Sequence, residues 1–336
     1  MRTPAPARIT RSAAVAATIA VFALTGCASQ PGQQSATGTD GSTTLKLAAI
    51  GLTSDGSLIL GIDKGFFADE GLEIETSIVA NPPAGLAAAQ SGQVDLAYAP
   101  SIPALNALSQ GIPLEVIIGA DGYPDGAAQA GDPGSIDDTG LYASAQSGIS
   151  AVEQLEGKTI AVPARKAQLE VTITNTLVEN GVDPATVNWV VLDFASAVAA
   201  LKNGTVDAAG LTSQFRDQAE ADGATFLAAP GIEFFEEGAV GLWVAGASTA
   251  ESKSDVLAAF QRAIVKSSEY ANEHPEEAVQ AGLEFTQSPL TVDEVRVPFW
   301  TPHVREDDIE RVNKKLVDLG FLPAPVPLDG VIVAEQ

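Results

Sequence analysis

Short apolar runs alternate with longer amphipathic stretches over most of the chain. The runs have the length of strands, and the stretches between them have the length of helices. Strands that alternate with such helices predict parallel βαβ units and an α/β fold. The predicted strands are Leu45–Ile50, Leu72–Val79, Thr159–Val162 and Val187–Leu192, and the predicted helices between them are Leu58–Phe67 and Leu169–Glu179.

One stretch of the chain occurs twice in similar form. Residues 88–97 read AAQSGQVDLA and residues 200–209 read ALKNGTVDAA, with a serine four residues later in both copies. The shared glycine predicts the end of a helix, the residues after it a short strand, and the serine the start of another helix. A repeat with so long a period predicts two similar lobes and not a solenoid.

The last hundred residues add helices rather than strands. An apolar strand is expected at Ala239–Ala245, followed by a long amphipathic helix at Ala250–Asn272 that ends at His274-Pro275. Two further helices are expected at Glu276–Phe285 and Glu306–Leu319. Helices without strands of their own should pack back on the first lobe. The predicted domains are therefore 45–140 with 238–336 as the first lobe and 141–237 as the second, joined by two crossovers.

The N-terminus has the order of a secretory signal. Three arginines, at positions 2, 8 and 11, precede the apolar run Ala13–Thr25, which is too short to span a bilayer. Residues 1–26 are predicted to be removed. Leu24-Thr25-Gly26-Cys27 resembles the lipobox of bacterial lipoproteins, which implies a diacylglycerol on Cys27. An ordinary secretory signal with a chance cysteine is the alternative. Residues 27–44, rich in Ser, Gln, Gly and Thr, predict a flexible tether.

Composition excludes several classes of function. Cys27 is the only cysteine, so the mature chain has no disulfide framework and no thiolate nucleophile or thiolate metal site. Loss of the signal would change the formal net charge from −25 to −28. Such a charge disfavours nucleic acid and anionic lipid as partners. His274 and His303 are too isolated for a metal site, and no cofactor is expected.

Ligands of parallel sheets bind beyond the carboxyl ends of the strands, where helices begin. The polar residues that follow the predicted strands are therefore candidate ligand-binding residues, together with two tryptophans near the crossover and between the last helices. The candidates are Thr53, Ser54, Asp55, Asn81, Ser101, Asp121, Tyr123, Arg165, Lys166, Asp193, Ser213, Gln214, Trp243 and Trp300.

Each candidate also has a structural interpretation. Thr53, Ser54 and Ser101 suit helix caps, and Asp55 suits a turn. Arg165 and Lys166 could bind a carboxylate or sulfonate, or could form surface salt bridges. Tryptophan, like Phe194 and Phe215, is usually a core residue. Residues 121–140 lack periodicity, and a loop of that length is usually functional or disordered.

Four segments resemble a known family. Gly56–Glu75, Gln90–Asp95, Gly111–Ile117 and Leu155–Val162 are similar to solute-binding proteins of ATP-driven (ABC) importers, in particular the nitrate, sulfonate and taurine group. That group shares its fold with proteins that bind the pyrimidine precursor of thiamine. The resemblance covers about residues 45–321. It implies a type II periplasmic-binding-protein fold, with two doubly wound α/β lobes, a ligand cleft and two crossovers.

The resemblance also implies a function. The two lobes would close over a small solute and deliver it to a membrane permease with its ATPase, and the protein would act as a lipid-anchored monomer on the extracytoplasmic face of the cell membrane. Arg165 and Lys166 favour a small organic anion. A thiamine-pyrimidine-type heterocycle stacked on Trp243 or Trp300 is the alternative ligand. An enzyme on the same fold is disfavoured, because no cysteine-rich or Ser/His/Asp site is present. A lipoprotein that binds another protein is the third possibility.

Overall fold

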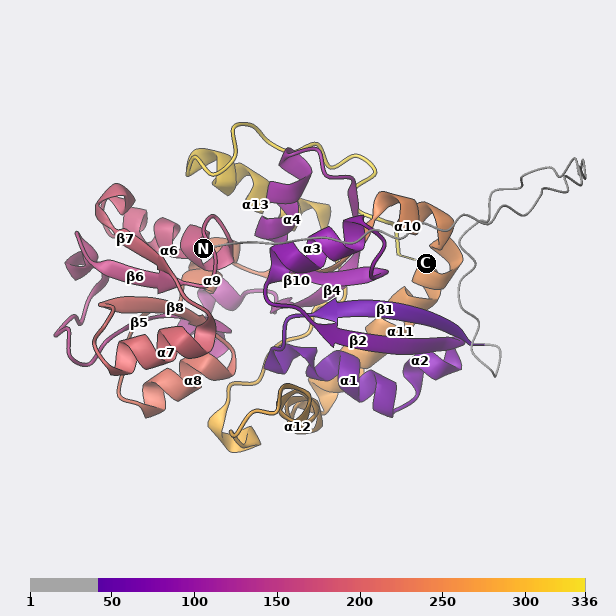
Figure 1. Ribbon diagram of the computed structural model, residues 1–336, viewed down its shortest axis with the longest axis horizontal. Helices are drawn as coiled ribbons and strands as arrows, with labels where there is room; N and C mark the ends of the chain where they lie inside the picture. Colours follow the sequence, from indigo (N-terminus) through magenta and orange to yellow (C-terminus); the bar gives the residue numbers. More distant parts are fainter. Residues whose placement is uncertain (1–41, 336) are drawn as a thin grey trace, which may run out of the picture. The chain divides into compact units, whose positions relative to one another are not determined.

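The structure is a computed structural model that describes residues 42–335 (Figure 1). The signal, Cys27 and residues 28–41 lie outside the described residues. Thr43 and Thr44, predicted to belong to the tether, are instead the first residues of strand β1, where they pair with Leu72 and Glu73.

Two five-stranded sheets organise the described chain. The first has the strand order β2-β1-β3-β10-β4 and the second the order β7-β6-β8-β5-β9. We call the parts of the chain built on them the first and the second lobe. The strands of the first sheet are β1 Thr43–Ala49, β2 Leu72–Ile78, β3 Leu96–Pro100, β4 Leu114–Tyr123 and β10 Gly238–Gly246; those of the second are β5 Thr139–Ala143, β6 Thr159–Val162, β7 Asn188–Val191, β8 Ala208–Thr212 and β9 Thr225–Ala228.

Helices cover both faces of each sheet. In the first lobe α3 and α4 pack on one face, with α13 against α4, whereas α2 and α11 lie on the other face with α1 and α12 (Figure 1). The helices of the first lobe are α1 Gly56–Asp63, α2 Phe66–Asp69, α3 Pro82–Gln90, α4 Ser101–Ser109, α10 Ala247–Ser252, α11 Ser254–Glu273, α12 Pro275–Thr286 and α13 Glu306–Asp318.

In the second lobe α6 packs on one face of the sheet and α7 and α8 on the other. Its helices are α6 Gln168–Glu179, α7 Phe194–Lys202, α8 Gln214–Ala221 and α9 Pro230–Phe235, and the short α5 spans Pro133–Ile136. Single 3-10 turns occur at Thr53–Asp55, Ala127–Gln129, Val152–Leu155, Pro184–Thr186 and Val292–Glu294. The predicted doubly wound α/β fold is confirmed.

The internal repeat has a physical basis in the structure. Asp95 accepts a hydrogen bond from the Lys46 amide at 2.9 Å, and Asp207 accepts one from the Thr159 amide at the same distance. In each lobe, therefore, the repeated aspartate joins two neighbouring strands: Asp95, just before β3, binds β1, and Asp207, just before β8, binds β6. The glycine before it, Gly92 or Gly204, has a positive φ at the end of a helix, as the pattern predicted.

Both sheets contain one antiparallel strand. The strand expected at Ala239–Ala245 is confirmed as β10, but the sequence predicted neither its antiparallel direction nor β5. β10 runs antiparallel between β3 and β4, and β5 runs antiparallel between β8 and β9. Each of these strands enters its sheet just after the chain has crossed from the other lobe. An antiparallel strand begins where its parallel neighbours end, so the residue before β5 lies at the carboxyl edge of the second sheet.

Residues 121–140 are not a structureless loop, which corrects the expectation from the sequence. Asp121–Tyr123 completes β4, and the stretch then contains a 3-10 turn, α5 and the start of β5. Asp137 fixes the end of this connection. Its carboxylate accepts hydrogen bonds from the Tyr123 hydroxyl at 2.5 Å, the Thr139 amide at 2.8 Å and the Ile232 amide at 3.0 Å. No helix of the described residues is long and apolar enough to cross a membrane.

Candidate functional site

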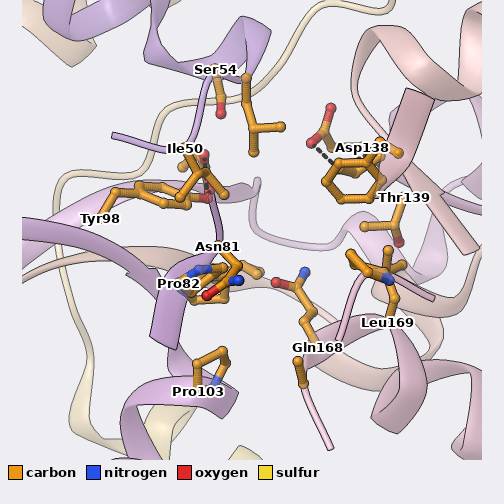
Figure 2. Close-up of a pocket in the computed structure, with 18 of the residues that line it drawn as sticks. Ile50, Ser54, Asn81, Pro82, Tyr98, Pro103, Asp138, Thr139, Gln168 and Leu169 are labelled. Atoms are coloured by element: carbon orange, nitrogen blue, oxygen red, sulfur yellow. Dashed lines mark hydrogen bonds between the residues drawn. The ribbon is translucent and has the colours of Figure 1, made fainter. Parts of the chain in front are cut away.

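A cavity of about 280 Å³ lies where the carboxyl edges of the two sheets face each other. Figure 2 shows Tyr98, Ile50 and Asn81 of the first lobe on one side and Asp138, Thr139 and Leu169 opposite them. The volume is at the lower end of ligand pockets, which suits a small solute. The residues that line it are Ile50, Leu52, Ser54, Ala80, Asn81, Pro82, Tyr98, Pro100, Pro103, Asp121, Gly122, Tyr123, Asp138, Thr139, Pro163, Ala164, Ala167, Gln168, Leu169, Asp193, Phe194, Thr212, Val240, Pro298 and Phe299.

Asp121 is the acidic residue of the first lobe in this cavity. Both of its carboxylate oxygens accept from the Tyr98 hydroxyl, at 3.1 and 3.0 Å. Burial raises the pKa of Asp121, and hydrogen bonds from Ser54, Tyr98 and the Gly241 amide act in the opposite direction. The Ser54 hydroxyl therefore lies near this carboxylate, yet it makes no hydrogen bond of normal geometry.

Asp138 is the acidic residue of the second lobe. It precedes β5, and its carboxylate accepts from the Thr212 hydroxyl at 2.9 Å and from the Ser213 hydroxyl at 3.1 Å. Burial raises the pKa of Asp138 to about 7, and the negative charge of Asp121 adds to the shift. The two carboxyls thus act on each other across the cavity.

A third buried acid lies behind the cavity wall. Burial raises the pKa of Asp55 to about 7, although its carboxylate accepts from the Gly51 and Leu52 amides at 3.1 and 2.9 Å. The charge of Asp121 also contributes to this shift. These bonds support the turn interpretation of Asp55.

Among the described residues, no lysine or arginine lines the cavity. The positive charge of Arg216, outside the lining, lowers the pKa of Asp138. This buried guanidinium donates to the Tyr142 hydroxyl at 3.0 Å and to the carbonyls of Gly134, Asp137 and Thr139. Its donors are therefore occupied by the second lobe itself, and the electrostatic character of the cavity is acidic.

Helix starts beside the cavity are poor in backbone donors. α3 begins with Pro82 and Pro83, and Pro103 is the third residue of α4. Proline has no N–H, so these residues remove donors from first turns that would otherwise offer them to an anion. The next amide of α3, at Ala84, is already bound by the Asn81 side chain at 3.1 Å.

The structure places five of the predicted binding residues in the cavity wall: Ser54, Asn81, Asp121, Tyr123 and Asp193. Asp193 is exposed and caps α7, where its carboxylate accepts from the Ser196 amide at 2.8 Å. This hydrogen bond lowers the pKa of Asp193.

Other predicted polar residues lie outside the lining and bind protein groups. The Thr53 hydroxyl donates to the Gln214 side chain at 3.0 Å, which joins the two lobes. Ser213 supports Asp138, and Asp55 closes its turn. Ser101 starts α4 and is fully buried, with no hydrogen-bond partner for its hydroxyl.

Arg165 and Lys166 also lie outside the lining. The Arg165 side chain, 51% exposed, forms a two-point ion pair with Glu170 at 2.7 and 2.9 Å. Lys166 donates its backbone amide to Glu170 and accepts a bond from Asn106 on its carbonyl. The salt-bridge interpretation of Arg165 therefore fits its geometry.

Trp243 and Trp300 lie in the core and not in the cavity wall, so their structural interpretation fits and their listing as candidate binding residues does not. Trp243 is 2% exposed on β10 and packs edge-on against Tyr98 and Phe260. Trp300 is 1% exposed, and its indole N–H donates to the Ser54 carbonyl at 2.8 Å. Trp300 thus holds the turn that carries Ser54.

Sequence reasoning missed Asp138, Tyr98 and Phe299 as cavity residues. Asp138 was missed because it lies in the stretch interpreted as a loop, and Tyr98 because it is inside a strand. Phe194, interpreted as a core residue, stacks on Phe215 with ring centroids 5.1 Å apart and also lines the cavity. Within residues 42–335, no group of three or more His, Cys, Asp or Glu residues is placed to hold a metal ion.

Comparison with solved structures supports the fold. The alkanesulfonate-binding protein SsuA from Xanthomonas axonopodis pv. citri, bound to MOPS, superposes with a TM-score of 0.69 at 16% identity, covering 86% of this chain and 98% of that chain. The periplasmic nitrate-binding protein NrtA from Synechocystis PCC 6803 gives a TM-score of 0.71 at 15% identity, covering 84% and 83%. At such identities these similarities show a periplasmic-binding-protein fold.

SsuA from Escherichia coli, an aliphatic sulphonate binding protein, gives a TM-score of 0.67 at 16% identity, covering 86% of this chain and 97% of that chain. No curated protein matches the sequence. A family model does match, and it covers residues 38–283, which is most of the chain. The protein is therefore a member of the NMT1-like family.

Proposed function

We propose that this protein is an extracytoplasmic solute-binding subunit of an ABC importer, which captures a small solute by closure of its two lobes. The observation that carries the proposal is the cavity, because its wall is formed by strand ends of both sheets and is complete only when the lobes meet. The proteins with similar structures are binding proteins, which supports the same function.

Polar contacts bridge the lobes around this cavity. Thr53 donates to Gln214 at 3.0 Å, and the Asn106 side chain donates to the Lys166 carbonyl at 2.8 Å. Arg296, close in sequence to the cavity residue Phe299, pairs with Asp217 and Glu220 on α8. Opening of the lobes would break these contacts, so they favour the arrangement that encloses a solute.

Anchoring and delivery complete the proposed function. A diacylglycerol on Cys27 would hold the protein at the outer face of the cell membrane, and the segment up to β1 would let the monomer reach its permease and ATPase. The permease would then take the solute when the lobes open. Replacing Cys27 with alanine should release the protein into the medium without a change in solute affinity. Retention of the variant at the membrane would contradict the anchor.

The charge of the solute is a separate question. The names of the similar proteins favour an anion, as does the sequence prediction based on Arg165 and Lys166. In this chain those two residues lie outside the cavity wall. An Arg165→Ala variant tests the anion hypothesis directly, since unchanged affinity for every anion that binds would remove its basis. A flat heterocycle remains the alternative ligand, and Tyr98 and Phe194 rather than the tryptophans would contact it.

The function is tested by a thermal-shift screen of residues 28–336 with sulfonates, carboxylates, nitrate, amines and pyrimidines, followed by small-angle scattering. A ligand at about 100 times its Kd stabilises the folded state by about 2.7 kcal/mol, which a melting curve resolves. At least one class should raise the melting temperature and make the protein more compact. Stabilisation without compaction would instead favour a protein-binding lipoprotein or an enzyme on this fold.

A further inference from the structure

We propose that the cavity binds a small organic cation, of the type of a protonated amine with an apolar body, whose charged end lies between Asp121 and Asp138. The inference rests on the proposed solute-binding function and adds the ligand class. It departs from the anions that the similar proteins are named for.

The first argument is the unbalanced charge of the cavity. Asp121 and Asp138 accept hydrogen bonds from neutral groups, the hydroxyls of Tyr98, Thr212 and Ser213 and the Gly241 amide. A carboxylate that is partly withdrawn from water, with no cation in the cavity lining, is unfavourable, so it either takes up a proton or attracts a positive ligand. The raised pKa values of Asp121 and Asp138 mean that both carboxyls hold a proton more tightly than a solvent-exposed carboxyl does in the ligand-free protein.

The second argument is an unused hydrogen-bonding group. The Ser54 side chain lines the cavity, is 7% exposed and has no hydrogen-bond partner for its hydroxyl. An ammonium group has three N–H donors and no acceptor. Asp121, Asp138 and the Ser54 oxygen provide three acceptors for it, from both lobes. Such a ligand would therefore also favour closure.

The third argument is the apolar remainder of the wall. Leu52, Leu169 and Phe194 line the cavity together with several prolines, and Phe299 lies there with 36% of its surface exposed. Figure 2 shows Pro82 and Pro103 on the first-lobe side and Leu169 opposite, away from the Ser54 end. Burial of the apolar body of a ligand there would favour binding. Aromatic rings also attract a cation within about 6 Å.

An anion would meet the opposite conditions. It would approach two carboxyls without a lysine or arginine in the described lining, and the prolines at the starts of α3 and α4 remove backbone donors. Like charges at short range are repulsive. A zwitterion such as an aminosulfonate would satisfy the carboxyls and leave its sulfonate without a counter-charge.

The test uses three probes with one body and different charge: 2-phenylethylammonium, 2-phenylethanol and 2-phenylethanesulfonate. Their affinities for residues 28–336 are measured by calorimetry and thermal shift. The amine should bind best and the sulfonate worst. The variants Asp121→Asn and Asp138→Asn should each weaken amine binding at least about tenfold, since hydrogen bonds to charged groups are lost. The matched control Asp183→Asn removes an exposed carboxylate remote from the cavity and should stay within about twofold.

Ser54→Ala gives a second variant should an aspartate variant fail to fold, because the Ser54 hydroxyl makes no hydrogen bond of normal geometry in the protein. The Ser54→Ala variant should also bind the amine more weakly than the wild type. The inference is overturned if the sulfonate binds as well as the amine, if the amine does not bind, or if amine affinity is the same in all variants. Should another solute of the wider screen bind in any of these cases, the solute-binding function stands and only the ligand class is wrong. Should no solute bind at all, both fail.

Discussion

Replacement of Asp138 by asparagine should change how the stability of the ligand-free protein depends on pH. The folded-state pKa of Asp138, about 7, lies above its ordinary value of 3.8. The folded protein therefore binds a proton more tightly than the unfolded chain. The contribution of this tighter proton binding to the free energy of unfolding is fully present below about pH 4 and is lost as the pH rises through about 7.

The magnitude follows from the size of the shift. A change from 3.8 to about 7 corresponds to at most about 4 kcal/mol. Asp138 is only partly buried and faces the cavity, so we take about half of this, ~2 kcal/mol. The charges of two neighbours have opposite effects on the pKa of Asp138: Asp121 raises it and Arg216 lowers it. Asparagine has no charge to lose, but it gives up part of the bonding to Thr212 and Ser213, at a cost of about 1 kcal/mol.

We expect that the free energies of unfolding of the wild type and the variant, plotted against pH, cross. At pH 4 the Asp138→Asn variant should be less stable than the wild type by about 1 kcal/mol, and at pH 8 it should be as stable or more stable. The assay is urea unfolding of protein freed of ligand by unfolding and refolding. The wild type should lose stability from pH 4 to 8, and Asp55, whose pKa is also about 7, should leave part of this loss in the variant. Parallel curves would refute the reasoning.

Three further predictions concern the support of the cavity. Gly241→Ala should weaken binding of any solute that the cavity takes by about tenfold or more, because a Cβ at this position would clash with the Asp121 carboxylate. The control Gly131→Ala has open space around it and should leave the affinity measured by calorimetry unchanged. Trp300→Phe should lower the free energy of unfolding in urea by about 1 kcal/mol through loss of the bond to the Ser54 carbonyl, and an unchanged value would count against this anchor. Arg296→Ala should increase the radius of gyration of the ligand-free protein in small-angle scattering. The control Arg262→Ala, which removes a surface ion pair with Glu70, should not. Equal radii for the wild type and both variants would show that Arg296 does not hold the lobes together.

The repeated pattern made the fold predictable. The glycine and aspartate of each copy have the same local role: the glycine ends a helix, and the aspartate joins β3 to β1 or β8 to β6, so each copy of the repeat lies in one of the two sheets. The antiparallel strands were not predictable in this way. β5 and β10 have no counterpart in the repeat, because each belongs to the chain that has just crossed from the other lobe.

The site was predictable only where a strand end and a cavity edge coincide, as at Ser54, Asn81 and Asp121. A sequence shows that a residue follows a strand but not where its side chain points. Arg165 follows β6 as expected, yet its guanidinium is bound by Glu170 in the first turn of α6. Trp300 lies between α12 and α13 as expected, but its indole N–H donates inward to the Ser54 carbonyl.

Asp138 shows a different kind of limit. Its role depends on a carboxyl from the other lobe, some 17 positions away in the sequence and across the cavity, and on the direction of β5. Neither can be deduced from local pattern. The charge of the cavity is a property of the folded arrangement, and in this chain it is opposite in sign to the charge predicted for the site from Arg165 and Lys166.

The most direct test of the central claim is a crystal structure of residues 28–336 with 2-phenylethylammonium. The account predicts density in the cavity with the ammonium nitrogen within hydrogen-bonding distance of both Asp121 and Asp138, and with the ring against Leu169 and Phe194. An empty cavity with the amine bound elsewhere, or an anion from the medium in contact with these residues, would contradict it.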